Sequence, residues 1–556
     1  MTLVDEPMVE GRTPGTPTDP HAPSIGTPPK AKRRPARLWF RGAVAGLASG
    51  ALGLAIGEVV AGVDHELLSP VIGVGNKAID LVPVPLKTFA ISTFGRNDKK
   101  ALVIGMLVAI AVFAMVVGAG AIRRRWVGFV GLTLFGALGV AAAVEGRTGT
   151  AADAIPSLIA TVVAMVALDL LTRVARGRQG APSDNVETAS PSDRSGAPQP
   201  DRRRFLSLTV ATGAAAAGAA VLGRKLQSST TAVADRARRV LPRPAKALAA
   251  APAGVQAEGL GAITPFFTPN KGFYRIDTAL VVPRIDASSW SLAVKGMVDK
   301  PLTFSYDELL KRTLVERDIT LTCVSNEVGG QLMGNARWVG VPLRELLEEA
   351  GVKNGASQVV GRSTDGWTSG FPTAAVLDGR DALVALAMNG EPLPFAHGYP
   401  ARLIVPGLYG YVSATKWLSS IELTTLADFD AYWVPRGYAK QAPIKMASRI
   451  DVPRGLATVA PGKTAVAGIA WVQRTGIAKV ELQFDGGQWV EADLADEQSI
   501  DTWRQWHYAW DATPGRHEIA VRSTDKKGRL QIEERTAPLP SGATGWHSII
   551  VLVSGS

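Results

Sequence analysis

Four apolar segments, each long enough to cross a lipid bilayer, lie in the first third of this 556-residue chain. They cover residues 42–63, 101–122, 126–144 and 154–172. A helix needs about 20 apolar residues to span the hydrocarbon core of a membrane. The sequence therefore predicts a membrane domain of about four transmembrane helices over residues 41–175. A disordered cytoplasmic tail, rich in proline and then basic, is expected over residues 1–40.

Arginine clusters between these segments predict their orientation. Arg123-Arg124-Arg125 separates the second and third segments, and Arg173 and Arg176 follow the fourth. Cytoplasmic loops carry an excess of basic residues, and both clusters are cytoplasmic only if residues 66–95 do not cross. That stretch is broken by prolines, so we expect an interfacial or re-entrant segment. The less favoured alternative, a crossing at 66–95, places the Arg123 cluster outside. In the favoured topology Arg96, Lys99 and Lys100 lie outside instead.

The polar residues of the spans carry little sign of a redox site. Glu58 and Asp169 lie within or near the spans, and solvation near an interface is favoured over a functional role. No histidine lies in the four clear spans, and the single cysteine excludes a C-x-x-C-H haem attachment. We therefore expect no haem in this chain. The net charge of +11 is attributed to membrane topology rather than to nucleic-acid binding.

A second basic motif follows a Ser/Pro-rich linker predicted over residues 176–201. Arg202-Arg203-Arg204-Phe205-Leu206 precedes a weakly apolar Ala/Gly run that ends near Leu222. It resembles a twin-arginine export signal, here internal to the chain. The alternative is the basic flank of an ordinary fifth transmembrane helix. Either interpretation places an anchor at residues 202–224, an external tether at 225–261, and the rest of the chain outside the cytoplasm.

The remaining chain has the composition of soluble domains. Short strands alternate with polar helices such as 343–350 over residues 262–430, which predicts an α+β domain. Period-2 patterns separated by turn residues over 431–556 predict an immunoglobulin-like β-sandwich. Trp503, Trp506 and Trp510 are expected to be core or interface anchors.

The only cysteine, Cys323, marks the candidate site. It ends the strand-like run Ile319-Thr320-Leu321-Thr322 and precedes a loop with Gly329-Gly330. A lone cysteine is most often a small buried hydrophobe. At a strand end before a glycine-bearing loop, however, a thiolate is well placed to ligate a metal in a cleft.

Two blocks of sequence resemble the sulfite oxidase family of molybdenum-cofactor oxidoreductases, in a membrane-anchored bacterial form. The first is Cys323 with Asn326 and then Asn335-Ala336-Arg337-Trp338-Val339-Gly340-Val341-Pro342-Leu343. The second is His397-Gly398-Tyr399-Pro400-Ala401-Arg402, with Gly410 and Lys416-Trp417-Leu418. The resemblance covers roughly residues 262–553. It implies a sulfite-oxidase-like molybdopterin domain between the membrane helices and the sandwich.

The resemblance also implies roles for individual residues. Cys323 would ligate molybdenum, and Arg275 and Tyr438 would join it as catalytic residues. Asp277 stands where the family has a histidine. The residues implied to bind the cofactor are Tyr274, Arg275, Asp277, Cys323, Asp365, His397, Arg402, Gly410, Thr415 and Lys416.

The expected activity is oxygen-atom transfer on a small molecule outside the cytoplasmic membrane. Electrons would pass to or from a separate quinone or cytochrome, and the sandwich suggests a possible homodimer. Alternatives are a true sulfite oxidase or dehydrogenase, and a non-enzymatic receptor or assembly module on the same fold. Sulfite-oxidising members have an arginine shortly after the cysteine, where this chain has Glu327-Val328. We therefore expect a neutral S- or N-oxide or another small organic substrate, unless Glu327 points to solvent and another arginine, such as Arg436, substitutes.

Overall fold

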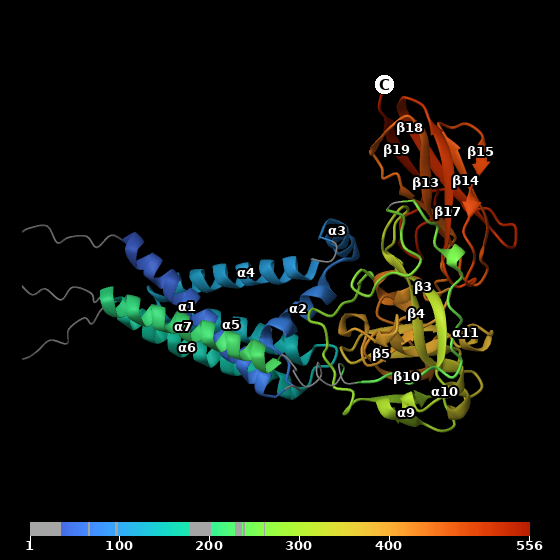
Figure 1. The fold of residues 1–556 in the computed structure, drawn as a ribbon. Helices are drawn as coiled ribbons and strands as arrows, with labels where there is room; N and C mark the ends of the chain where they lie inside the picture. The colour runs from blue at the N-terminus through green and yellow to red at the C-terminus, as the bar shows by residue number, and fades with distance from the viewer. Residues whose placement is uncertain are drawn as a thin grey trace, which may run out of the picture.

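The protein has three parts: a long helical bundle, an α+β domain at one end of it, and a β-sandwich packed on the α+β domain (Figure 1). The computed structural model describes residues 35–64, 67–94, 98–176, 202–227, 236, 239–260 and 262–555. The cytoplasmic tail predicted before residue 35, the linker over 177–201, part of the tether, His65 and Arg96 lie outside the described residues.

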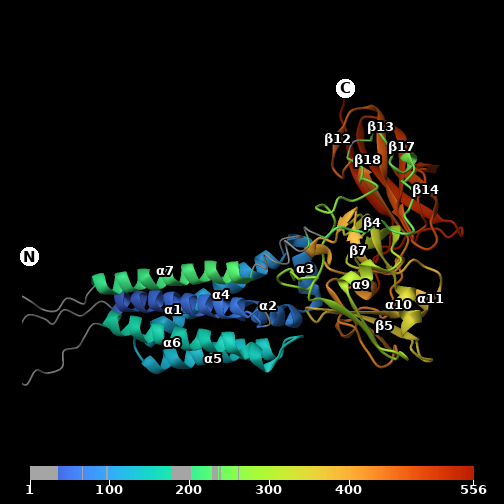
Figure 2. The same ribbon diagram turned by 60° about the horizontal axis from the view of Figure 1, so that its bottom comes forward.

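Five long helices form the bundle: α1 (Pro35–Val63), α4 (Asp98–Ala121), α5 (Arg125–Val144), α6 (Ala154–Arg176) and α7 (Arg202–Gln227). All five are long and apolar enough to span a membrane. Helix α1 is central and packs against α4, α6 and α7 (Figure 2). Glycines allow the close approach, since a Cβ at Gly46 would clash with the carbonyl oxygen of Ala114. Because α1 begins at Pro35, the last six residues assigned to the tail are helical.

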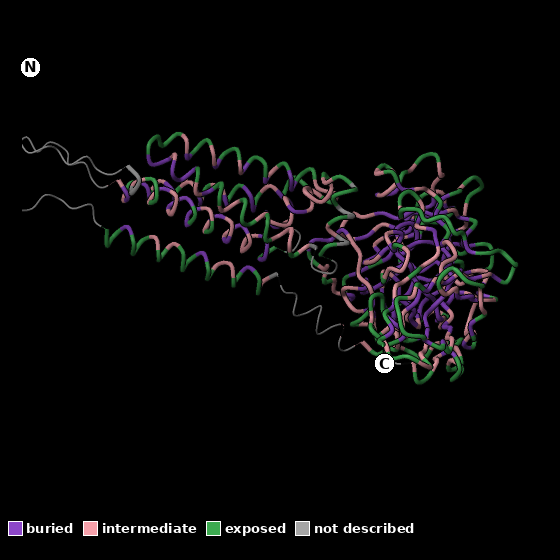
Figure 3. The backbone as a smooth tube through the Cα atoms, turned by 90° about the horizontal axis from the view of Figure 1, so that it is seen from above, coloured by how far each residue is buried: buried purple, intermediate pink, exposed green. Residues whose placement is uncertain are grey.

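Two short helices, and no long one, are present over the described residues 67–94. Helix α2 (Pro70–Leu81) has 12 residues and α3 (Val84–Phe94) has 11, with a break at Pro83. At 1.5 Å per residue neither reaches across a bilayer core, which agrees with an interfacial segment. Both lie between the bundle and the α+β domain (Figure 1). Many large apolar side chains of the bundle are exposed. Residues coloured as buried gather in the two globular domains (Figure 3).

One mixed sheet and one antiparallel sheet make up the α+β domain. The first has strand order β2-β1-β10-β5-β6, and the second β3-β4-β7-β8 with β9 paired to β7. The strands are β1 (Ser291–Gly296), β2 (Leu302–Ser305), β3 (Val315–Thr322), β4 (Met333–Pro342), β5 (Gln358–Ser363), β6 (Thr368–Pro372), β7 (Leu383–Met388), β8 (Glu391–Pro392), β9 (Arg402–Ile404) and β10 (Leu418–Thr424). The helices are α9 (Tyr306–Leu310), α10 (Leu343–Ala350), α11 (Ala374–Leu377) and α12 (Gly410–Ser413).

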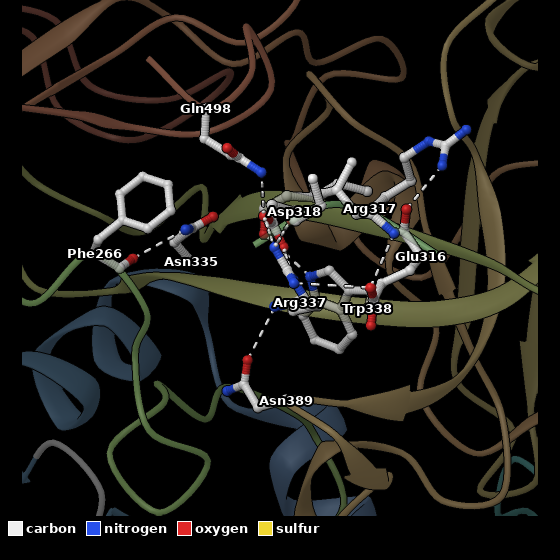
Figure 4. A network of polar contacts seen from close by, with 12 residues as sticks. Phe266, Glu316, Arg317, Asp318, Asn335, Arg337, Trp338, Asn389 and Gln498 are labelled. Atoms are coloured by element: carbon white, nitrogen blue, oxygen red, sulfur yellow. Dashed lines mark hydrogen bonds and ion pairs between the residues drawn. The ribbon is translucent and has the colours of Figure 1, made fainter. Parts of the chain in front are cut away.

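The pairing of β3 with β4 is held by a buried polar network (Figure 4). Arg337 makes a two-pronged ion pair with Asp318, with Nε and Nη2 each 2.8 Å from a carboxylate oxygen. The Asn335 amide donates to the Phe266 carbonyl at 2.9 Å, and the Trp338 indole donates to the Ile319 carbonyl at 3.1 Å. The conspicuous Asn-Ala-Arg-Trp motif thus fixes the strand that ends next to Cys323.

Two sheets facing each other across one apolar core form the C-terminal domain. Their orders are β11-β13-β17-β16 and β12-β19-β18-β14-β15. The strands are β11 (Ala447–Val452), β12 (Thr458–Val459), β13 (Gly462–Trp471), β14 (Ile477–Phe484), β15 (Trp489–Glu491), β16 (Asp493–Leu494), β17 (Arg504–Ala512), β18 (Gly515–Asp525) and β19 (His547–Val553). Trp506 and Trp510 are in this core, whereas Trp503 is in the core of the α+β domain.

One predicted boundary needs correction. Residues 431–446 were assigned to the sandwich, but Tyr438, Ala442 and Ile444 are buried in the core of the α+β domain. These three residues are not in the core of the sandwich, whose first strand begins at Ala447. The segment predicted as a tether contacts the α+β domain, because Lys246 pairs with Val315 at the edge of β3.

Candidate functional site

Cys323 directly follows β3 and lies at the head of a tight loop. Its backbone N–H donates to the Leu332 carbonyl at 2.9 Å. The side-chain oxygen of Asn326 accepts from the Leu332 amide at 2.7 Å, and the loop closes through Gly329 with a φ of +77°. Only glycine takes that backbone conformation readily. The loop thereby holds Cys323, which is 8% exposed, in the wall of a cavity.

The cavity encloses about 960 Å³ of atom-free space, counting its open mouth. Its lining includes the Cys323 thiol with several aromatic residues, and a charged part with Asp277, Arg402 and Lys416, which we call the charged end. Burial raises the pKa of the Cys323 thiol, and hydrogen bonds from Ser325 together with the charge of Lys416 partly offset that rise. The described lining residues include Tyr274, Asp277, Cys323, Ser325, Asp365, Arg402, Gly410, Tyr411, Lys416, Trp433 and Tyr438.

A cluster of buried cations lies at the charged end. Arg402 is 4% exposed, donates to the carbonyls of His397 and Ala414, and lies over the Trp338 ring. Its Nε has no hydrogen-bond partner, and no carboxylate pairs with it among the described residues. Burial lowers the pKa of Arg402 to about 10. A buried cation without a counter-ion is costly, so this end is prepared for an anion.

Asp277 is the carboxylate of this cluster. It receives ion pairs from Arg275 Nε at 2.8 Å, from Lys416 Nζ at 2.8 Å, and from Lys99 at the start of α4. Burial alone would raise the pKa of Asp277, but Lys416, Lys99 and Arg275 together hold it far below its usual range. Burial lowers the pKa of Lys416 to about 8 despite this partner.

His397 lies next to the cations of this cluster. Its Nε2 donates to the Asn270 carbonyl at 3.0 Å, and its ring packs edge-on against Phe273. Burial, then the charges of Lys416 and Arg402, lower the pKa of His397 to about 3. The imidazole is therefore neutral at pH 7, with its other nitrogen left as an acceptor.

A second contact from the membrane side lies beside the cavity. Arg147, in the loop between α5 and α6, forms a fork on Asp80 of α2 at 2.7 and 3.1 Å. Its third nitrogen reaches the hydroxyl of Thr278 at 2.7 Å, and its plane lies over the Tyr432 ring. Arg436 covers Tyr432 at 3.8 Å and lies 3.7 Å from Asp80. The bundle thus contacts two segments of the cavity wall.

Comparison with known proteins agrees with this site. Residues 279–433 match the family described as "Oxidoreductase molybdopterin binding domain". An uncharacterised oxidoreductase of Bacillus subtilis, YuiH, is 33% identical over 183 residues, which is 33% of this chain and 89% of that protein. This chain belongs to the sulfite oxidase family of molybdenum-cofactor oxidoreductases. Within this family, rat mitochondrial sulfite oxidase is 28% identical over 341 residues, 52% of this chain and 62% of that protein. The chain therefore matches only about three-fifths of the length of the mammalian enzymes.

Among solved structures, sulfane dehydrogenase SoxCD from Paracoccus pantotrophus is similar, with a TM-score of 0.46 and 23% identity. The likeness covers 53% of this chain and 85% of that one.

The residues present fit the molybdenum cofactor of this family. One end of the cavity offers a soft thiol, and the other offers the unpaired guanidinium of Arg402 with Lys416 for a phosphate. Cys323 would hold the metal, while Arg402 and Lys416 would hold the phosphate-bearing end of the pterin.

The structure brings most of the predicted site residues to the cavity. Those in its lining are Tyr274, Asp277, Cys323, Asp365, Arg402, Gly410, Lys416 and Tyr438. Three others are not in the lining. Arg275 pairs with Asp277, His397 lies beneath the cation cluster, and the Thr415 hydroxyl is 2.6 Å from that of Ser369 and 3.3 Å from the Gly361 carbonyl.

Several residues of the site were missed by sequence reasoning. Tyr411 and Trp433 pack around Tyr438, with ring centroids 5.4 and 5.3 Å away, and form an aromatic wall with Ser325 near the thiol. The available signal for Trp433 was its closeness in sequence to Tyr438, in Trp433-Val434-Pro435-Arg436-Gly437-Tyr438. The signal for Lys99 was different. The favoured topology places this lysine outside the membrane at the end of a span, against the usual distribution of basic residues.

Proposed function

We propose that this protein is a membrane-anchored oxidoreductase that catalyses oxygen-atom transfer on a small neutral molecule outside the cytoplasmic membrane. The supporting observation is the single cavity that joins the Cys323 thiol to the buried, under-neutralised cations Arg402 and Lys416. When bound, the cofactor supplies two-electron oxygen-atom transfer chemistry. The chain's own residues bind it, orient it and shape the substrate end.

The substrate end supports a neutral substrate. Ser325 and Tyr438, beside the thiol, carry no charge at pH 7, and Tyr411 and Trp433 pack around Tyr438. Lys416 is the cationic lining residue whose charge acts on the thiol. Burial raises the pKa of the Tyr438 hydroxyl, so it stays protonated and can donate to a substrate oxygen. Trp433 and Tyr411 give a polarisable surface for a small organic group.

Anchoring by five transmembrane helices fits the positive-inside pattern. The Arg123 cluster and Arg176 lie together at one end of the bundle, since Arg176 donates to the Ile122 carbonyl at 3.0 Å. The α+β domain lies at the other end (Figure 1). That arrangement supports an extracytoplasmic catalytic domain, with electrons exchanged with a separate quinone or cytochrome. We also propose that the sandwich is immunoglobulin-like and mediates a homodimer.

Sulfite is the first alternative substrate, because the mammalian relatives carry that name. The purified full-length protein should contain about one molybdenum and one pterin per chain. It should then be screened against sulfite and against neutral S- and N-oxides with an artificial electron carrier. Absence of pterin and of any oxygen transfer would refute the proposed function.

A further inference from the structure

A lysine from the membrane bundle reaches the charged end of the cavity through Asp277, although it is not itself in the cavity lining. Lys99 begins the span of α4, and its ammonium forms an ion pair with Asp277 across the junction between bundle and α+β domain. The lysine side chain is 17% exposed and the carboxylate 6%. Such burial distinguishes this pair from an ordinary surface contact.

Lys99 adds charge to a cluster that already has more cations than anions. Arg275, Lys416 and Lys99 all pair with the one carboxylate of Asp277. Arg402 is close enough to lower the pKa of Lys416, and so is Lys99. Four cations facing one carboxylate leave an excess of three positive charges.

The partners of Asp277 bind different oxygens of its carboxylate. Lys99 contacts Oδ1, whereas Lys416 Nζ and Arg275 Nε contact Oδ2. Asp277 is thereby neutralised from the bundle side. The positive charge of Lys416 and Arg402, both at the cavity, is then available to an anion rather than consumed within the protein.

We propose that Lys99 is a cofactor-binding determinant: the membrane bundle completes the cation cluster that takes the dianionic phosphate of the pterin. This inference rests on the proposed function. It makes the bundle part of the catalytic unit, because the cofactor domain alone would lack one of the four cations.

The test measures cofactor retention in the full-length protein in detergent, rather than turnover. Molybdenum and oxidised-pterin fluorescence per chain are followed during dialysis. In Lys99→Gln the Asp277 carboxylate would draw on the charge of Lys416 instead. The cofactor should then be released about 10- to 100-fold faster, the value of one charge-assisted contact of Lys416. Lys99→Arg should keep it, and so should Lys100→Gln, a change at the exposed neighbouring lysine.

A double variant separates charge from domain docking. Lys99→Gln combined with Asp277→Asn removes one cation and one anion, so the excess of three positive charges returns. Restored retention in the double variant supports the proposal, while retention as poor as in Lys99→Gln overturns it. Unchanged retention in Lys99→Gln overturns it as well.

Two further outcomes are informative. A wild-type protein without pterin contradicts the proposed function itself rather than the role of Lys99. Lipid phosphorus bound in place of pterin, lost in Lys99→Gln, overturns the assignment of the anion to the cofactor.

Discussion

Arg147 of the bundle donates a hydrogen bond of 2.7 Å to the hydroxyl of Thr278, a residue in the wall of the cavity. The same guanidinium is held on Asp80 and over the Tyr432 ring. Tyr432 in turn donates to Asp80 at 2.6 Å. The bundle therefore helps to position this wall of the cavity, together with the α+β domain itself.

Replacing Arg147 should loosen this junction. Arg147→Met leaves Asp80 and Thr278 without their shared donor, and each charge-assisted hydrogen bond contributes about 1.5–3 kcal/mol. We expect amide hydrogen exchange to speed up at residues 276–278 and 432–436. Arg344→Met is the control, because its pair with Glu348 is on the surface, with both side chains 54% exposed. Equal exchange in Arg147→Met and wild type would contradict a positioning role.

Cys323→Ser should abolish oxygen transfer while leaving the fold intact. The hydroxyl replaces the thiol in the same loop but is a poor ligand for a soft metal centre. Loss of outer-shell partners alone costs about 10- to 100-fold in activity, so loss of the ligand should cost more. Pterin should still bind, because Arg402 and Lys416 are unchanged. Turnover at the wild-type rate in this variant would refute the assigned role of Cys323.

Anion binding to the charged end should weaken as pH rises through about 8. The pKa of Lys416 is lowered to about 8, mainly by burial. Below that pH the ammonium attracts an anion, and above it the neutral amine does not. Sulfate stays a dianion throughout and is a suitable probe for calorimetry on cofactor-free protein between pH 6.5 and 9.5. Affinity should fall about tenfold, in line with the loss of one charged contact. The fall should be absent in Lys416→Met.

Individual helices and strands could be predicted from the sequence, because the periodicity of apolar residues and the turn residues that bound each element lie within the element itself or next to it. Helix 343–350 was predicted with the bounds that α10 has, since its apolar residues follow one helical face and Gly351 stops it at a φ of +70°. Strand β19 likewise lies within the region in which period-2 alternation predicted strands. Strand β17 was missed, because its tryptophans Trp506 and Trp510 were considered only as anchors.

The site was only partly predictable, for a different reason. The pair Lys99–Asp277 joins residues 178 positions apart in two domains, and no periodicity signals such a contact. Thr415 was placed in the cofactor site by its neighbours in sequence, but its hydroxyl points to Ser369 and Gly361. Glu327 was considered a possible repulsive group, yet its side chain is exposed and outside the cavity lining. Direction of a side chain requires the tertiary structure.

Export should depend on the paired arginines at the start of α7. Helix α7 begins at Arg202, and Phe205 is buried under Arg41 of α1, so the helix is part of the bundle. We expect a reporter fused after Ala250 to be exported and the helix to remain uncleaved. Arg202→Lys with Arg203→Lys should block export, whereas Arg224→Lys at the other end should not. Export unchanged in the double variant would defeat the twin-arginine assignment and favour an ordinary fifth span.

The last prediction concerns the substrate, and the structure changes its basis. Repulsion by Glu327 no longer counts against an anion, because that side chain is exposed outside the cavity lining. Arg436 does not replace the missing arginine, since it donates to the Tyr432 carbonyl at 2.6 Å, pairs with Asp80 and lies outside the lining. The wall near the thiol therefore offers Ser325 and Tyr438 as neutral donors.

An anionic substrate gains no charge-assisted contact from Ser325 or Tyr438, and each missing one costs about 10- to 100-fold in binding. We expect kcat/KM for reduction of a neutral S- or N-oxide to exceed that for sulfite oxidation by at least about tenfold. Arg436→Met should leave the sulfite kinetics unchanged, because that guanidinium is engaged elsewhere. Steady-state sulfite oxidation with a micromolar KM and a turnover near the ordinary ~10 s⁻¹ would overturn this expectation. A large loss of sulfite turnover in Arg436→Met would then identify the arginine that binds the anion.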